Sequence, residues 1–120
     1  MATFSKDKLS GSTLGRGILL TNNAVSSGTT IHTGNTNASV QEELWVYAVN
    51  AHTANVKITL GWGGSTDPNN LIEFTVPTEA GLYLIIPGLL MQGNTTADTL
   101  VGNANTVNSV IVYGYVNRIA

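Results

Sequence analysis

Apolar residues recur at every second position along several short segments of this 120-residue chain. The clearest alternation lies in residues 55–62, where Val56, Ile58, Leu60 and Trp62 are separated by polar or small residues. Side chains two positions apart on a β-strand point to the same side of the sheet. We therefore predict a strand whose four apolar side chains face a core while the intervening residues face outward.

Eight segments are predicted as strands, because they are rich in β-branched or aromatic residues and are separated by turn-forming residues. They are residues 16–20, 29–33, 43–50, 55–62, 71–76, 82–86, 99–101 and 109–119. Pro87 and Gly88 predict a turn after the sixth segment. Short strands at intervals of about 8–12 residues predict an all-β fold, a single antiparallel β-sandwich of jelly-roll-like type with about eight strands.

The start of the chain has a weaker pattern. We expect an extended N-terminal arm at residues 1–13 and the β-sandwich domain at residues 14–120. Phe4 and Leu9 are the main apolar anchors of the arm. Two interpretations of the arm stay open: it reaches onto a neighbouring molecule, or it is a frayed terminus.

Two predicted strands are apolar on both faces, in residues 82–86 and 110–116. A central strand that is covered on both sides explains such a pattern, and so does a subunit interface over the outer face. Exposed apolar patches of more than roughly a few hundred Å² usually mark contact sites. Our candidates for an oligomer or partner interface are Trp45, Tyr47, Tyr83, Ile85, Ile111, Tyr113 and Tyr115.

The composition excludes several kinds of partner. Charged residues make up 10% of the chain, against about 25% in an average globular domain. The formal net charge of −2 leaves no basic patch for nucleic acid or an anionic membrane. The longest apolar run contains Pro87 and Gly88 and is shorter than the roughly 20 residues that span a bilayer. We therefore expect no nucleic-acid or membrane partner, and, without a secretory signal, synthesis in a cytoplasm.

The sequence contains few residues that could form a catalytic or metal-binding site. The chain has no Cys, and its two histidines, His32 and His52, are fewer ligands than a zinc site usually needs. Asp67 belongs to an ordinary turn sequence rather than to a calcium loop. Glu42 and Glu43 are the only adjacent carboxylates, and neighbours on a strand point to opposite faces. No nucleophile motif or phosphate-binding glycine loop is complete, so we expect no enzyme, no cofactor and no metal.

The aromatic residues allow two functions. Exposed rings on a β-sandwich can stack on pyranose rings, which favours a carbohydrate-binding, lectin-like module that uses Trp45 or Tyr113. In the other interpretation Trp62 lies in the core. Tyr47, Tyr113 and Tyr115 then lie between subunits, where a ring with a polar hydroxyl group is favoured. We weigh core and interface positions ahead of sugar binding.

Four segments, residues 44–50, 58–64, 80–88 and 112–119, together resemble small virion proteins of tailed bacteriophages. The resemblance covers about residues 14–119. It implies a jelly-roll or sandwich unit without enzymatic activity that binds the capsid exterior as a decoration or cement protein. It also implies a homo-oligomer, most often a trimer, with the major capsid protein or another virion protein as partner and the capsid surface as location. The alternatives are a neck or tail component and the carbohydrate-binding module.

Overall fold

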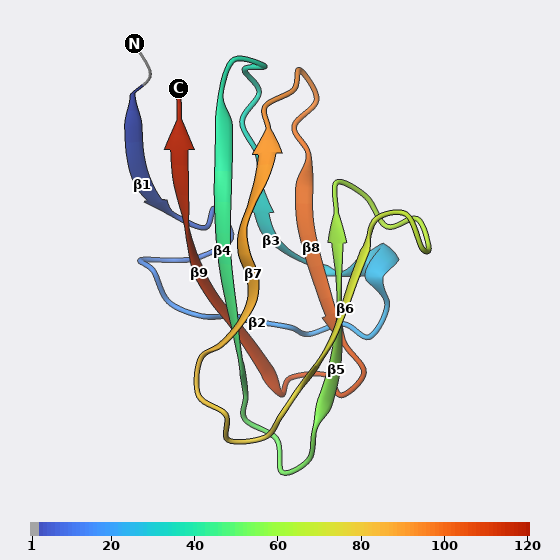
Figure 1. The fold of residues 1–120 in the computed structure, drawn as a ribbon. Helices are drawn as coiled ribbons and strands as arrows, with labels where there is room; N and C mark the ends of the chain where they lie inside the picture. The colour runs from blue at the N-terminus through green and yellow to red at the C-terminus, as the bar shows by residue number, and fades with distance from the viewer. Residues whose placement is uncertain (1–2) are drawn as a thin grey trace.

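Two antiparallel β-sheets lie face to face and enclose the core (Figure 1). The computed structural model describes residues 3–120. Its strands are β1 (Phe4–Lys8), β2 (Ile18–Leu19), β3 (Thr29–Thr33), β4 (Gln41–Asn50), β5 (Val56–Trp62), β6 (Leu71–Val76), β7 (Tyr83–Gln92), β8 (Thr99–Ala104) and β9 (Val110–Ile119). The described residues also form one 3₁₀ turn, η1 (Val25–Ser27), and no helix long and apolar enough to cross a membrane.

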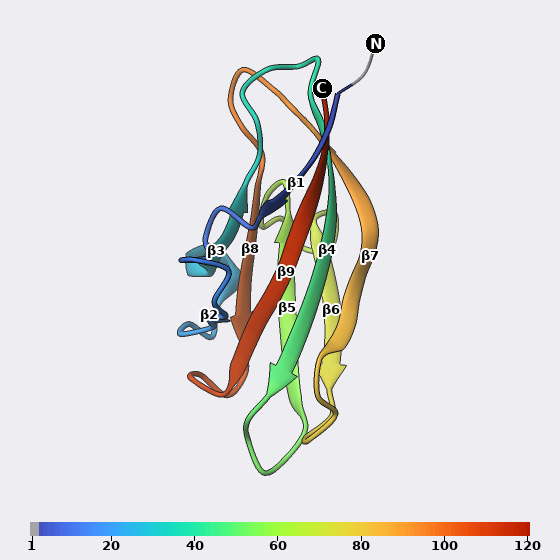
Figure 2. The same ribbon diagram turned by 90° about the vertical axis from the view of Figure 1, so that its left-hand side faces the viewer.

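Sheet A has the strand order β1-β9-β4-β7, with β2 also paired to β9, and sheet B has the order β3-β8-β5-β6. The chain changes sheet after most strands, and Figure 2 shows the two layers from the side. If β1 and β2 are counted as one interrupted strand, two four-stranded sheets with these orders form a jelly roll. The predicted antiparallel β-sandwich of jelly-roll type is therefore confirmed, with nine strands instead of about eight.

The alternation of residues along the central strands separates the core from the outer surface. On β4, Leu44 and Val46 are completely buried, whereas Trp45 and Tyr47 lie on the outer side. Trp62 packs against the core, as predicted. The same alternation on β5 and β9 buries Val56, Ile58, Leu60, Val110, Val112 and Val116.

Strand β7 differs from the prediction at Pro87 and Gly88. The chain does not turn there but continues as one strand beside β4, with two shifts of register. Because β7 is an edge strand of sheet A, the interpretation of residues 82–86 as a central strand is wrong. Proline is tolerated at the edge of a sheet, where its missing N–H need not remove a ladder hydrogen bond.

The segment expected as an N-terminal arm, residues 1–13, is part of the sandwich over its described residues. β1 pairs antiparallel with β9 along its whole length, and Leu9 is completely buried. Gly11 donates its N–H to the carbonyl of Ile31 in sheet B over 2.9 Å. Residues 1–2 lie outside the described residues. The described part of the segment is thus an edge strand and a connection held to both sheets.

Candidate functional site

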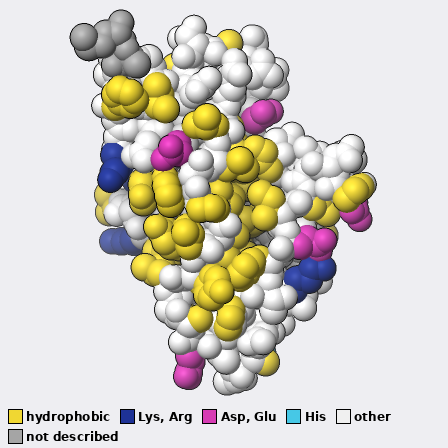
Figure 3. Space-filling view, viewed as in Figure 1, with side chains coloured by type: hydrophobic (Ala, Val, Ile, Leu, Met, Phe, Trp, Pro, Cys, Tyr) yellow, Lys and Arg dark blue, Asp and Glu magenta, His cyan; other side chains and the backbone are white. Residues whose placement is uncertain are grey.

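Sheet A presents an apolar surface on the side away from the core. Its central strands β4 and β9 carry half-buried or exposed side chains there, which we call the aromatic face: Trp45, Tyr47, Ile111, Tyr113 and Tyr115. Figure 3 shows hydrophobic side chains gathered over the middle of this side of the molecule. An antiparallel sheet usually carries polar residues on its solvated side. The aromatic face therefore indicates a contact surface.

A row of contacts crosses the four main strands of sheet A. Trp45 and Tyr115 are opposite each other on β4 and β9, and their rings are nearly parallel, with centroids 6.3 Å apart. The Lys6 ammonium group on β1 lies 4.8 Å from the centre of the Tyr115 ring, in cation–π contact. Gly88 on β7 approaches Trp45 so closely that a Cβ there would lie 3.0 Å from the indole. Trp45 thus lies between Gly88 and Tyr115, and Tyr115 between Trp45 and Lys6.

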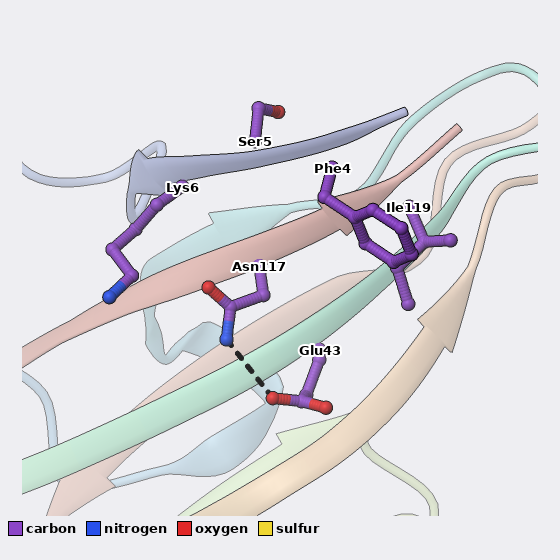
Figure 4. A pocket seen from close by; sticks show the side chains of 6 residues that line it. All are labelled: Phe4, Ser5, Lys6, Glu43, Asn117 and Ile119. Carbon is purple, nitrogen blue, oxygen red and sulfur yellow. Dashed lines mark hydrogen bonds between the residues drawn. The ribbon is translucent and has the colours of Figure 1, made fainter. Parts of the chain in front are cut away.

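A hollow of about 360 Å³ lies at one end of the aromatic face (Figure 4). Residues of β1, β4 and β9 line it: Phe4, Ser5, Lys6, Glu43, Asn117 and Ile119. The Glu43 carboxylate accepts hydrogen bonds from Nε1–H of Trp45 and, over 3.1 Å, from Nδ2 of Asn117. These donors, Trp45 before Asn117, lower the pKa of Glu43, although desolvation acts in the opposite direction. The hollow therefore combines an ionised carboxylate, an amide and an apolar wall.

We expect Trp45→Phe to raise the pKa of Glu43, because phenylalanine keeps an aromatic ring at this position but lacks the Nε1–H donor. In the wild type the lowered pKa favours the folded state above the pKa of an unfolded glutamate. This contribution disappears as the pH falls through the folded-state pKa. The chemical shift of the Glu43 carboxyl carbon, followed by NMR from neutral to acidic pH, measures the change. Asn117→Ala is the control and should cause a smaller rise, and an unchanged midpoint in Trp45→Phe would contradict the assignment.

Two of the seven candidate interface residues lie away from the aromatic face. Tyr83 reaches from β7 towards sheet B, where its ring centroid is 5.1 Å from that of Phe74 on β6. Ile85 packs against the core. Ile85 also lines an apolar hollow of about 180 Å³, to which Ile72 of β6 contributes. The structure thus brings five of the seven residues together and places Tyr83 and Ile85 at an edge.

A polar cluster with buried His32 and Glu42 at its centre joins the two sheets. Glu42, 1% exposed, accepts a hydrogen bond from Nε2 of His32 over 2.9 Å. Its other carboxylate oxygen accepts hydrogen bonds from Nε and Nη2 of Arg118 over 3.1 and 2.9 Å. The Nδ1 atom of His32 accepts the backbone N–H of Ser10 over 3.0 Å. Because Nδ1 is an acceptor, Nε2 carries the proton that His32 donates to Glu42. We call these four residues the buried clasp.

The buried clasp contains a serine, a histidine and a carboxylate, but not in the arrangement of a nucleophile and its base. Ser10 contacts His32 through its backbone N–H, while its Oγ accepts the N–H of Thr33 over 2.6 Å. His32 is only 3% exposed. The contacts tie the connection after β1 to β3, β4 and β9. We therefore assign the clasp a structural role.

Sequence reasoning missed the buried clasp, although one signal was present. Glu42 shares a strand face with Leu44, and Arg118 shares one with Val116. The alternation of both strands therefore directs these two charges towards the core side, where a charge needs a partner. No local pattern shows that His32, on the other sheet, is that partner.

The other polar residues that the sequence singled out, His52 and Asp67, lie in the connections between strands. His52 is exposed between β4 and β5. In the loop after β5, Asn70 accepts the N–H of Thr66 over 3.2 Å and donates to the carbonyl of Trp62 over 3.0 Å. Within residues 3–120, no three His, Asp or Glu side chains converge in a way that could hold a metal ion. The aromatic face and its hollow are therefore the candidate site.

Comparisons with protein-family models, curated proteins and solved structures find no match to this chain. A jelly roll is used both by capsid proteins and by lectins, so the fold alone does not distinguish the two expected functions.

Proposed function

We propose that this chain is a structural virion protein of a tailed bacteriophage, a capsid decoration or cement protein that binds the capsid exterior as a homo-oligomer. The observation that carries the proposal is the aromatic face, which the chain leaves uncovered. Tyr113 is 36% exposed, and the neighbouring Trp45, Tyr47 and Tyr115 are only half-buried. Apolar surface of this kind marks contact sites on soluble proteins.

Such a protein acts through contact area rather than chemistry. A copy that spans two capsomers adds an interface that must break before the shell can swell or burst. Stable interfaces bury about 1,200–2,000 Å². The composition supports this role, because a chain with only 10% charged residues packs beside identical copies with little charge repulsion.

The test compares capsids with and without the protein. Purified chain added to capsids assembled without it should bind saturably and raise the temperature at which the capsids open. Tyr113→Ser should weaken binding at least about tenfold, because it removes an exposed aromatic anchor. Thr75→Ser, exposed on sheet B, is the control and should bind like the wild type. Equal heat tolerance of capsids with and without the protein would contradict the cement role, and binding only to necks or tails would favour the neck or tail alternative.

A carbohydrate-binding module is the second candidate, favoured by the hollow beside Glu43. Its carboxylate and amide groups next to the Phe4 ring are of the kind that bind sugar hydroxyls. The row of stacked contacts argues against it, because Trp45 and Tyr115 already pack against neighbours. Titration with a glycan panel, followed by Trp fluorescence, separates the candidates. A saturating signal that Glu43→Gln abolishes favours sugar binding, and a flat titration favours the protein interface.

A further inference from the structure

Exposed apolar side chains concentrate at two edges of sheet A. At the β1–β2 edge, Phe4, Leu14 and Leu19 are 73%, 77% and 40% exposed. At the β7 edge the exposed leucines are Leu82, Leu84, Leu89 and Leu90, with exposures from 39% to 60%. The strand order β1-β9-β4-β7 places these edges on opposite sides of the sheet. A single chain therefore has two separate apolar edges.

We propose that copies of this chain join head to tail, with the β1–β2 edge of one copy against the β7 edge of the next. The inference rests on the homo-oligomer of the proposed function and names the surfaces that form it. The partner on each edge is a second copy of the chain. The aromatic face between the two edges then stays free for the capsid.

The two edges differ in charge. The β1–β2 edge carries Lys6, Lys8 and Arg16, and its carboxylate Asp7 lies 3.7 Å from Arg118. Figure 3 shows Lys and Arg side chains on the β1 side of the molecule. Strand β7 has no charged residue, the carboxylate of Glu73 on β6 is paired with Lys57, and Glu79 lies in the turn between β6 and β7. Two β1–β2 edges would repel each other, whereas β7 brings no cation against the Lys and Arg side chains of a β1–β2 edge.

The difference between the edges determines the symmetry. A two-fold dimer pairs a surface with itself, so it would either bring the cations of two β1–β2 edges together or leave those edges uncovered. A head-to-tail contact covers both edges of every copy, and a closed ring leaves none exposed. A ring of three copies would be the trimer that the resemblance to virion proteins implies.

The β7 edge is suited to side-chain contact rather than to strand addition. Pro87 lacks a backbone N–H, and the register with β4 shifts twice along the strand. Proline and bulges at an edge prevent a neighbouring strand from extending the sheet. The leucines on either side of Pro87 remain available to pack against the exposed Phe4 and Leu14 of the next copy.

The test uses one variant for each edge. Phe4→Ser with Leu14→Ser alters the first edge, and Leu84→Ser with Leu90→Ser alters the second. All four positions are exposed, so circular dichroism should show folded chains. Light scattering behind a sizing column should give a closed oligomer for the wild type and a single-chain mass for each variant. An equimolar mixture of the two variants should give a dimer with one chain of each, because only one intact pair of edges remains.

The mass of this mixture distinguishes a head-to-tail contact from a two-fold contact. A mixture that stays monomeric, a variant that still assembles like the wild type, or a monomeric wild type would each overturn the head-to-tail contact. Val107→Ser, at an exposed residue in the turn between β8 and β9, is the control and should keep the wild-type mass. Capsid binding is measured separately. A monomeric wild type that still stabilises capsids overturns only this inference, whereas a ring that binds no capsid overturns only the decoration role.

Discussion

Replacing Glu42 by alanine is expected to lower the free energy of unfolding by about 3 kcal/mol. This buried carboxylate accepts three hydrogen bonds from His32 and Arg118. Alanine leaves the Nε2–H of His32 without an acceptor inside the protein and removes the main partner of Arg118. Breaking a buried ion pair costs about 3–5 kcal/mol. We expect the lower end because the Arg118 side chain is 36% exposed and regains water. Urea unfolding, followed by Trp fluorescence, measures the loss.

Two further variants separate this effect from a surface effect. Glu73→Ala also breaks an ion pair, but its partner Lys57 is exposed, so the loss should stay below about 1 kcal/mol. Arg118→Met leaves the Glu42 carboxylate buried without its cation and should cost about as much as Glu42→Ala. The double variant should lose less than the two single losses combined, because both remove the same interaction. If Glu42→Ala costs no more than Glu73→Ala, the buried clasp does not hold the sandwich together.

β3, β5, β6 and β9 begin and end within one residue of the predicted bounds. On β5 and β6 the alternation has one possible orientation towards the core. β9, which is apolar on both faces, is instead recognised by its run of β-branched and aromatic residues. β1 was missed because its residues, Phe4–Lys8, are mostly polar and none is fully buried. It is a strand because it pairs with β9, and such pairing is not contained in a local pattern.

The turn predicted at Pro87 and Gly88 is wrong because the local residues do not show the pairing of this strand with β4. Pro87 and Gly88 form a typical turn pair, yet pairing with β4 through two register shifts keeps the strand continuous. A bulge accommodates residues that do not fit a regular ladder. Whether such a pair makes a turn or a bulge therefore depends on the neighbouring strand.

The residues of the aromatic face were predictable, but their contacts were not. The alternation of β4 and β9 separates inward aliphatic residues from outward rings. The register that sets Trp45 opposite Tyr115, and the edge position that turns Tyr83 towards Phe74, depend on which strands pair. The buried clasp likewise joins positions as distant as Ser10 and Arg118.

Leu9→Ala should also lower the free energy of unfolding by about 3 kcal/mol, because truncating a fully buried leucine leaves a cavity. Leu9 has no exposed surface, although it belongs to the segment that the sequence presented as an arm. Lys8→Ala, at the exposed neighbouring position, is the control and should change the stability by less than about 0.5 kcal/mol. Urea unfolding of both variants measures the difference.

Leu9→Ala also tests whether the N-terminal segment packs on its own chain or on a neighbouring copy. We would measure it in the Leu84→Ser/Leu90→Ser background, which should not assemble, so that unfolding is not coupled to dissociation. If the segment folds onto its own chain, the loss is the same at every protein concentration. If it is exchanged between copies, the midpoint rises with concentration, because a partner then stabilises the folded state by mass action. A loss below about 1 kcal/mol, or a concentration-dependent midpoint in this background, would place Leu9 outside the core of its own chain. An arm that reaches onto a neighbour would then be the better interpretation.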